Sequence, residues 1–432
     1  MKDREKIDRI LGALEAGTPL LDGERLRGFV GSLLAKKELY LNAHEKGGSP
    51  LYLFDEAALV RKIREFKAAF REEIPGHRVF YALKSNSHPF LAETVVKEGC
   101  GIDVSSGLEL EKAMEQDPEA VIFSGPGKTL EELALACRNA GKVTVLLDSF
   151  GEMDRLEEAA AREGVTAKAG VRLTNEEKGL WRKFGIPLTR LPEFFEESRS
   201  RTHIDLCGLQ FHSSWNMDPE RQTAFIARVG ETLSRMKKDL VGRLRFLDIG
   251  GGYWPSEGEW LQSAGTAEGR VMEAAGCPAA DTMKHFHVPS APITVFARDL
   301  AAALEQHIFP YAKCVIYLEP GRWFSHEAMH ILLKVVDKKA PDVVVCDGGV
   351  NMTGWERYEL DYFPVINLSR PSLEESPCMV FGSLCNPHDI WGYSYFGNGI
   401  EPGDILLVPR QGAYTYSLRQ EFIKPVPLVV RL

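Results

Sequence analysis

The sequence predicts an α/β fold in which a (β/α)8 TIM barrel is followed by a β-rich domain of sandwich-like or barrel-like form. Short β-rich runs alternate with helix-like segments up to about residue 325, and polar residues follow these runs. Beyond that point strand-like segments continue with few helical stretches between them. Alternation alone also fits an open doubly wound sheet. The barrel is favoured because its enzymes carry their chemistry at the C-terminal ends of the strands.

The first 50 residues have the pattern of an amphipathic helical segment. Leu11 and Leu14 are among its expected inward positions, and the Gly-Gly-Ser-Pro stretch at 47–50 breaks the pattern. A short strand is expected at 51–54. We expect the segment 1–50 and this strand to pack with the β-rich domain.

The barrel is expected over residues 51–325. Its eight β-like runs are Arg78–Leu83, Gly101–Val104, Ala120–Phe123, Val143–Leu147, Lys168–Leu173, Leu206–Phe211, Leu244–Ile249 and Cys314–Leu318. Residues 253–313 separate the last two runs by more than one helix requires, and they predict an inserted lobe or lid.

The β-rich domain is expected over residues 326–432. Its strand-like segments are Ile331–Lys338, Val343–Cys346, Cys378–Phe381, Ile405–Pro409 and Phe422–Leu432.

Composition narrows the class of protein. The chain of 432 residues has a formal net charge of −9 and no strongly basic block, which argues against nucleic acid or an anionic membrane as partner. No run approaches the length of a transmembrane helix. The segment 1–9 is charged and lacks an apolar signal core. Eight cysteines without a Cys-x-x-Cys pair fit reduced thiols, so we expect a cytoplasmic protein, and we predict no metal site.

Four features at the run ends point to one cofactor. Lys84 follows the first run, Gly250-Gly251-Gly252 follows the seventh, and Glu319 and Arg322 follow the eighth. A lysine amine can form a Schiff base with an aldehyde, and exposed glycine N–H groups and an arginine can bind a phosphate. A carboxylate can keep a pyridine nitrogen protonated. Each feature alone has an ordinary reading, as a surface charge, a turn or a surface ion pair. Together they predict a pyridoxal 5′-phosphate (PLP) site.

Three further residues are candidates. His212 ends the sixth run, where it would lie over the cofactor ring. Tyr414, after Gln411-Gly412-Ala413, could donate its hydroxyl to the phosphate, although a core tyrosine is the plainer reading. Cys385 is followed by polar residues and is a candidate acid or nucleophile, although most lone cysteines are inert.

The spaced motifs resemble those of the fold-type III PLP decarboxylases, the alanine-racemase-like barrel family that contains diaminopimelate, ornithine and arginine decarboxylases. The resemblance runs from about residue 51 to 427. Its motifs are Tyr81-Ala82-Leu83-Lys84-Ser85-Asn86, Asp103-Val104-Ser105-Ser106-Gly107-Leu108-Glu109, Phe211-His212, Asp248-Ile249-Gly250-Gly251-Gly252, Glu319-Pro320-Gly321-Arg322, and Cys385 with the later Gly412-Ala413-Tyr414.

The resemblance implies a role for each matched residue. Lys84 holds PLP as a Schiff base, Glu319 pairs with the pyridine nitrogen and His212 stacks on the ring. The phosphate is held by Gly250, Gly251, Gly252, Arg322 and Tyr414, while Asp103 supports the lysine and Arg172 lies near the ring. The resemblance also implies a head-to-tail homodimer with shared active sites, in which Cys385 reaches the partner's site and protonates the substrate carbanion.

The departures from the family concern the substrate. Family members that take diamino acids follow the loop cysteine with Asp or Glu, where this chain has Asn386, and the position of a family arginine aligns with Trp355, with Arg357 nearby. Trp215 replaces a family serine, for which Ser213 or Ser214 could substitute. We expect substrate contacts from Asn386, Asp389, Arg357 and Tyr358.

Our hypothesis is therefore decarboxylation of a modified or conjugated amino acid from specialised, siderophore-type metabolism. Glu319 favours decarboxylation over racemisation. The alternatives are a PLP-dependent racemase or epimerase on the same scaffold, and a non-catalytic PLP-binding homologue.

Overall fold

The computed structural model describes residue 14 and residues 17–276, 282–354 and 357–432. The expectations for Leu11 and Trp355 lie outside these residues. The chain divides into two compact units. We call residues 59–256 and 291–325 the barrel unit, and residues up to 58, 257–290 and 326–432 the β unit.

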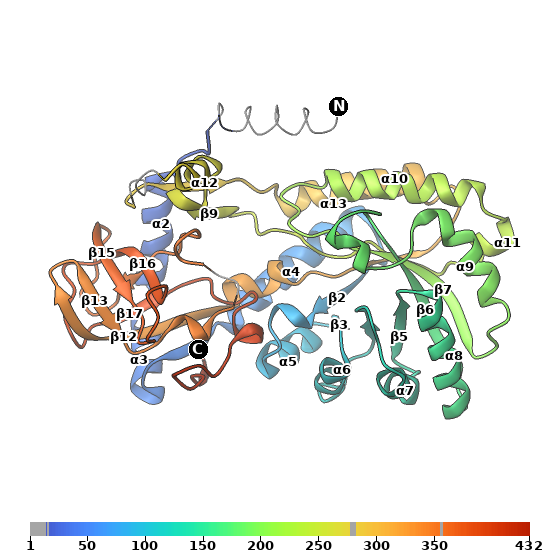
Figure 1. Cartoon of the computed structure of the whole chain (residues 1–432), viewed down its shortest axis with the longest axis horizontal. Coiled ribbons are helices and arrows are strands. Elements are labelled where there is room, and N and C mark those ends of the chain that lie inside the picture. The colour runs from blue at the N-terminus through green and yellow to red at the C-terminus, as the bar shows by residue number, and fades with distance from the viewer. Residues whose placement is uncertain (1–13, 15–16, 277–281, 355–356) are drawn as a thin grey trace. The chain divides into compact units, whose positions relative to one another are not determined.

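Eight of the described strands close a parallel barrel, as the sequence predicts (Figure 1). β11 pairs with both β8 and β2, so the sheet has no free edge, and this excludes the open doubly wound sheet. The barrel strands are β2 Arg78–Ala82, β3 Gly101–Val104, β4 Val121–Phe123, β5 Val143–Leu147, β6 Ala167–Leu173, β7 Ile204–Phe211, β8 Phe246–Asp248 and β11 Val315–Leu318.

Large and small side chains together fill the barrel interior. A buried cluster includes Phe80, Ile122, Leu146, Phe246 and Tyr317, with the Phe246 and Tyr317 rings stacked at 4.7 Å between centroids. The Phe246 ring requires a glycine opposite it, because a Cβ at Gly208 would lie 2.0 Å from its Cζ. The interior is therefore a packed core, and chemistry is left to the strand ends.

Helices surround the barrel, and their starts carry the expected side-chain caps. Ser106, Thr129 and Ser149 accept hydrogen bonds from backbone N–H groups of the first turns that follow them. The helices are α4 Glu56–Glu73, α5 Pro89–Lys97, α6 Gly107–Met114, α7 Leu130–Arg138, α8 Phe150–Glu163, α9 Leu191–Ser198, α10 Glu220–Arg235, α11 Lys238–Val241, α13 Ile293–His307 and α14 Arg322–Ser325.

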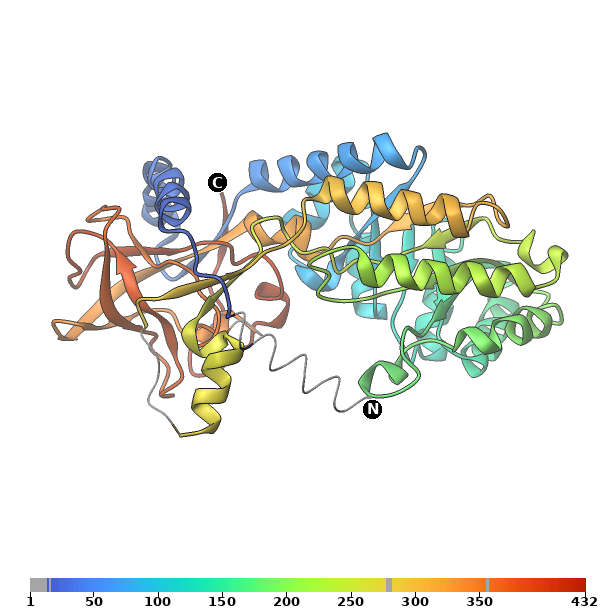
Figure 2. The same cartoon turned by 90° about the horizontal axis from the view of Figure 1, so that it is seen from above.

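The segment 253–313 is a smaller insert than predicted. Helix α13 lies beside α10 on the barrel in both views (Figures 1 and 2), because its buried face of Phe296, Leu300 and Leu304 packs there. Only residues 257–290 belong to the β unit. They form β9 Glu259–Gln262, α12 Ala267–Ala274 and β10 His285–Val288.

The β unit contains a sheet of eight described strands in the order β13-β15-β16-β14-β17-β12-β1-β18. Its elements outside the insert are α2 Gly23–Leu34, α3 Lys37–Gly47, β1 Leu51–Phe54, β12 Met329–Ala340, β13 Val343–Cys346, β14 Ile366–Asn367, β15 Glu375–Phe381, β16 Ile390–Phe396, β17 Ile405–Val408 and β18 Val429–Arg431.

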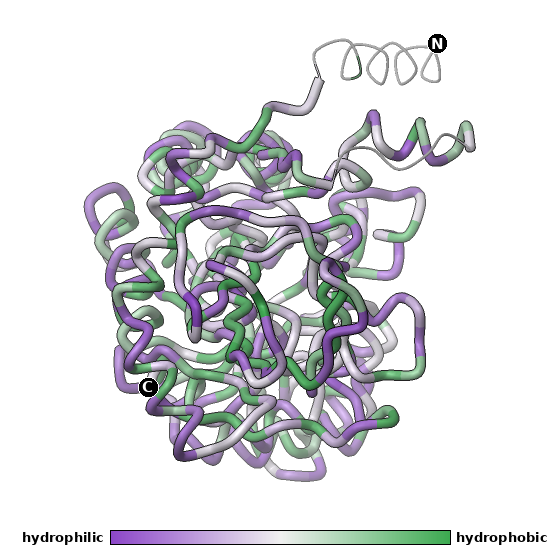
Figure 3. Tube along the Cα trace, turned by 90° about the vertical axis from the view of Figure 1, so that its left-hand side faces the viewer, coloured by the Kyte–Doolittle hydropathy of each residue, from purple (hydrophilic) through white to green (hydrophobic). Residues whose placement is uncertain are grey.

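The strand at 51–54 belongs to this sheet and not to the barrel. β1 is antiparallel to β12, with Leu51 opposite Leu332, so the expected barrel boundary at residue 51 is too early. Helices α2 and α3 bury Val30 and Tyr40 in a core that includes Leu332 and Leu407. The hydrophobic and hydrophilic stretches of the chain alternate along its course in Figure 3, as expected of elements that each have one buried side.

One strand prediction in this unit is wrong, and the strands β14 and β16 have no counterpart among the predicted segments. The segment 422–432 forms a strand only at β18, because Pro425 and Pro427 lack the N–H that a sheet ladder requires. The sequence Ile390–Phe396, which forms β16, was missed, since its glycine and serine weaken the strand pattern. None of the helices among the described residues is long and apolar enough to cross a membrane.

Candidate active site

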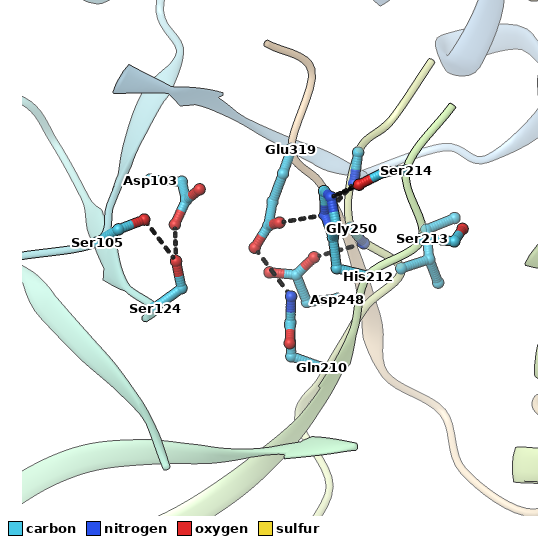
Figure 4. Close-up of polar contacts among 12 residues, drawn as sticks. Asp103, Ser105, Ser124, Gln210, His212, Ser213, Ser214, Asp248, Gly250 and Glu319 are labelled. Carbon is cyan, nitrogen blue, oxygen red and sulfur yellow. Dashed lines mark hydrogen bonds and ion pairs between the residues drawn. The ribbon is translucent and has the colours of Figure 1, made fainter. Parts of the chain in front are cut away.

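The C-terminal ends of the barrel strands bring four of the predicted residues to one place. Lys84 follows β2, Asp103 lies on β3, His212 follows β7 and Glu319 follows β11. In Figure 4, Asp103 lies on one side of Glu319 and His212 on the other. The strand order explains this, because β2 lies between β3 and β11 in the closed barrel.

Lys84 has a buried carboxylate as its neighbour. Its Nζ lies 3.2 Å from Oδ2 of Asp103, whose other oxygen accepts a 2.6 Å hydrogen bond from Ser124 Oγ. The Lys84 side chain is 36% exposed, whereas Asp103 is fully buried. Burial raises the pKa of Asp103 to about 7, although the Lys84 charge acts in the opposite direction. Asp103 can therefore hold or release a proton near neutral pH.

Glu319, Gln210 and Asp248 are buried and form a polar group with the partly buried His212 (Figure 4). Its Oε1 accepts from Gln210 Nε2 at 3.4 Å, and its Oε2 lies 3.4 Å from His212 Nδ1. Burial opposes ionisation of Glu319, but His212, the Lys84 charge and a hydrogen bond with Asp248 together lower its pKa. Burial and the neighbouring Glu319 raise the pKa of Asp248 well above its usual range. The site thus holds an ionised Glu319 beside a protonated Asp248.

Burial disfavours the charged form of the His212 ring, which has three polar neighbours. Burial lowers its pKa, and its Nδ1 lies 3.2 Å from the backbone nitrogen of Gly251 as well as close to Glu319. A neutral ring makes only one of these hydrogen bonds at a time, because Nδ1 donates to a carboxylate but accepts from an amide. The Ser214 hydroxyl lies 3.4 Å from Nε2. The ring presents a flat, uncharged surface to a cofactor.

The three glycines are required by close backbone approaches. A Cβ on Gly251 would lie 2.0 Å from the Glu319 carbonyl oxygen, and one on Gly252 would lie 2.1 Å from the Ser213 oxygen. Gly250 and Gly252 also have φ of +69° and +81°, which glycine adopts without strain. The Glu319 N–H donates to the Gly250 oxygen at 2.9 Å, so this loop is joined to the end of β11.

The two predicted arginines each lie over an aromatic ring. Arg322, at the start of α14, has its Cζ 4.5 Å from the centroid of Trp254. Arg172, on β6 and buried, has its Cζ 4.5 Å from the centroid of Phe184.

The β unit carries the remaining candidates. Cys385 is an exposed free thiol in the loop between β15 and β16. Tyr414 is half-buried at φ +60° in the segment after β17. Asp389 is buried, and its two carboxylate oxygens accept from the backbone N–H groups of Val350 and Leu384. Those bonds make Asp389 the residue that shapes the Cys385 loop, a simpler role than the expected substrate contact.

One pocket of the β unit collects the other three predicted substrate residues. Arg357, Tyr358 and Asn386 line a pocket of about 380 Å³ together with Glu359 and His388. Tyr358 is buried and donates to Gln411 Oε1 at 2.7 Å. The structure therefore groups Arg357 and Asn386, which in the sequence are separate departures from the family.

Gln210, Ser124 and Asp248 take part in the site but were given no role. Gln210 had a usable signal, because residues two apart on a strand face the same side and His212 follows it by two. Ser124 ends the third run, in the same position as the other candidates. Of the two serines proposed to replace the family serine, Ser214 lies against His212, while Ser213 points its hydroxyl away from Glu319 (Figure 4).

The residues present fit PLP. Lys84 provides the amine, Glu319 an anion for a protonated ring nitrogen and His212 a neutral flat partner. Among the described atoms of this buried site, Gln210 Oε1 has no hydrogen-bond partner. No group of three or more metal-binding side chains occurs within the described ranges.

Comparison with known proteins agrees with this site. The family model for the pyridoxal-dependent decarboxylase, pyridoxal binding domain, matches residues 57–326. Diaminopimelate decarboxylase of Methanothermobacter thermautotrophicus is 25% identical over 406 residues, covering 89% of this chain and 87% of the relative. The L-glutamyl-[BtrI acyl-carrier protein] decarboxylase of Niallia circulans is 24% identical over 398 residues, covering 85% of each protein.

Solved structures share the fold. Diaminopimelate decarboxylase from Helicobacter pylori, complexed with L-lysine, superposes with a TM-score of 0.72 at 22% identity, covering 91% of this chain and 94% of that one. Lysine/ornithine decarboxylase from Vibrio vulnificus, complexed with putrescine, gives 0.71 at 20% identity, covering 92% and 98%.

The chain belongs to the pyridoxal-dependent decarboxylase family, since the family model covers more than half of it. It is a PLP-dependent amino-acid decarboxylase of the diaminopimelate/ornithine type, as the sequence predicted.

Proposed function

We propose that this enzyme removes the α-carboxyl group of an amino acid whose distal end is modified or conjugated. The observation that carries the proposal is Asn386, which follows Cys385 where diamino-acid enzymes of the family carry Asp or Glu. An amide cannot pair with an ammonium group as a carboxylate does. The relative from Niallia circulans, which acts on a glutamyl group attached to a carrier protein, supports this reading.

Each cofactor-binding residue has one task in the proposed site. Lys84 holds the aldehyde carbon of PLP through Nζ, and Glu319 keeps the ring nitrogen protonated through its ionised carboxylate. His212 would cover one face of the ring, and Arg172 would lie near it. The phosphate is assigned to Gly250, Gly251, Gly252, Arg322 and Tyr414. When bound, PLP supplies a conjugated ring that accepts the electron pair left when CO₂ departs.

Two side chains of this protein, Asp103 and Cys385, transfer protons in the proposed reaction. Asp103 takes a proton from Lys84 Nζ, 3.2 Å away, because its raised pKa of about 7 allows exchange at neutral pH. Cys385, whose thiol is exposed, returns a proton to the substrate carbon in the site of a second copy. Two copies would then form a head-to-tail homodimer with shared sites, and we propose that this dimer works in the cytoplasm.

The distal end of the substrate is assigned to the pocket lined by Arg357, Tyr358 and Asn386. His388 pairs with Glu359 at 2.7 Å, so this carboxylate already has a partner. Asn386 and Arg357 favour a neutral or anionic group with hydrogen-bond acceptors. Amide, acyl and thioester carbonyls have that character.

A CO₂-release screen tests the proposal. L-lysine, L-ornithine and meso-diaminopimelate are compared with Nε-acetyl-L-lysine and a glutamyl thioester of a carrier protein. We expect low kcat/KM on every free diamino acid and at least a tenfold higher value on one modified substrate. Good turnover of diaminopimelate would overturn the substrate assignment.

Racemisation is the second candidate reaction, and it is separated by product analysis in D₂O. A racemase exchanges the Cα hydrogen and releases no CO₂, whereas the proposed reaction yields an amine with one deuterium at that carbon. The ionised Glu319 favours the second result, because a protonated ring nitrogen strengthens the electron sink.

A further inference from the structure

An aromatic stack lies directly beside the proposed phosphate-binding arginine. The Arg322 Cζ is 4.5 Å from the ring centroid of Trp254. The Trp254 ring in turn stacks on Trp215, with centroids 6.1 Å apart and planes 29° apart. Trp254 is 7% exposed and Trp215 is 55% exposed, so the inner ring is covered and the outer ring faces solvent.

The backbone holds the outer ring in place at a local cost. Trp215 has a φ of +53°, a left-handed conformation that bulky residues rarely adopt. Its neighbour Asn216 donates from its backbone N–H to the Gly252 oxygen at 3.0 Å and accepts from the Trp254 N–H at 3.2 Å. The side-chain amide of Asn216 also donates from Nδ2 to the Gly251 backbone oxygen at 3.1 Å. The loop that carries Trp215 is thus joined to the glycine loop and to Trp254.

Strain of this kind persists where the surrounding structure over-determines it, often at functional sites. The ring's described contact is with Trp254, which leads to Arg322.

We propose that Trp215 and Trp254 are positioning residues that hold the Arg322 guanidinium for the cofactor phosphate. A cation over an aromatic face is attracted by the ring's quadrupole, and a second ring stacked on the first restricts the plane of the first. This inference rests on the proposed phosphate role of Arg322.

The test compares two probes that differ only in the phosphate. The affinities of the apoprotein for PLP and for pyridoxal are measured from the absorption of the bound cofactor in wild type, Trp254→Leu and Trp215→Gly. Glycine suits the left-handed backbone at 215, so that variant removes the ring without backbone strain. We expect each variant to weaken PLP binding about 3- to 10-fold and pyridoxal binding less than about twofold. Trp254→Phe, which retains a ring, should recover most of the PLP affinity.

A matched control and a double-mutant cycle complete the design. Trp181 forms a tilted ring pair with Phe184, 5.6 Å between centroids, and Phe184 lies next to Arg172. Trp181→Leu should therefore leave the ratio of PLP to pyridoxal affinity unchanged. In an Arg322→Gln background, Trp254→Leu should add less than about twofold to the loss of PLP affinity.

Each result bears on the proposal. Equal losses of PLP and pyridoxal affinity in the Trp254 and Trp215 variants would mean a merely structural stack and would overturn the inference, as would unchanged affinities. If Arg322→Gln alone leaves the ratio unchanged, the assigned phosphate role of Arg322 fails and the inference falls with it. If Arg322→Gln changes the ratio but the tryptophan variants do not, only the inference fails.

Discussion

The cofactor residues of the barrel unit and the pocket of the β unit differ in how closely they follow the family. In the barrel unit, Lys84, His212 and Glu319 match the family motifs and form one connected polar site. In the β unit, Cys385 matches but Asn386 does not, and the pocket it lines contains an arginine. The difference supports the proposal that the carbon chemistry is kept while the recognised end of the substrate differs from that of the diamino-acid enzymes.

The largest effect is expected at Lys84, because this residue matches the family motif and provides the amine that binds PLP. Lys84→Ala should lower kcat for CO₂ release on the order of 10³-fold or more and remove the absorption band of the lysine-bound cofactor. Lys97→Ala, a change at an exposed lysine of α5, is the control and should behave like wild type. Retention of both the band and the activity in Lys84→Ala would contradict the assignment.

Glu319 should be next in size. Glu319→Gln keeps the shape of the side chain but removes the negative charge that keeps the ring nitrogen protonated. The kcat should therefore fall roughly 10²-fold while PLP remains bound. The absorption spectrum of the variant monitors the cofactor. An unchanged kcat would mean that another group protonates the ring.

Asp103 sets the expected pH dependence. Its raised pKa means that it is protonated below about pH 7 and ionised above it, and only the ionised form can take a proton from Lys84. The kcat/KM of wild type should therefore fall about tenfold per pH unit below this point. Asp103→Asn should have lower activity without this acidic limb. If kcat/KM still falls below about pH 7 in Asp103→Asn, the titration of a different group causes the fall.

In the β unit, the expected effect of a substitution is on the free energy of unfolding. Asp389→Ala removes both acceptors for the N–H groups of Val350 and Leu384 and should cost about 1–3 kcal/mol in the free energy of unfolding. Urea unfolding measures the change, and Asp342→Ala on an exposed turn is the control. If Asp389 instead contacts the substrate directly, KM should rise while the stability stays unchanged.

Much of the barrel unit could be predicted from sequence because its signals are local. Each strand is a short apolar run, and each chemical residue follows a run, so order along the chain gives position at the strand ends. The contacts of Gln210 and Asp248 with Glu319 were missed, because a strand pattern gives the side on which a residue lies but not its partner on another strand.

The β unit was harder to predict for physical reasons. β1 and β18 are parallel neighbours from opposite ends of the chain, and no periodicity indicates such pairing. Asp389 was predicted to contact the substrate because it is charged and near Cys385. In the structure its two oxygens accept from the backbone of Leu384 in its own loop and of Val350 in the segment after β13. The composition of a loop does not reveal where its carboxylates point.

The central claim is tested most directly by restoring the carboxylate at Asn386. The kcat/KM values for L-lysine and Nε-acetyl-L-lysine are measured in wild type and Asn386→Glu, with Asn398→Glu, at another exposed position of the β unit, as control. We predict that wild type prefers the acetylated substrate and that Asn386→Glu shifts the ratio toward free lysine by about tenfold. Wild-type preference for free lysine, with no shift on substitution, would contradict the account.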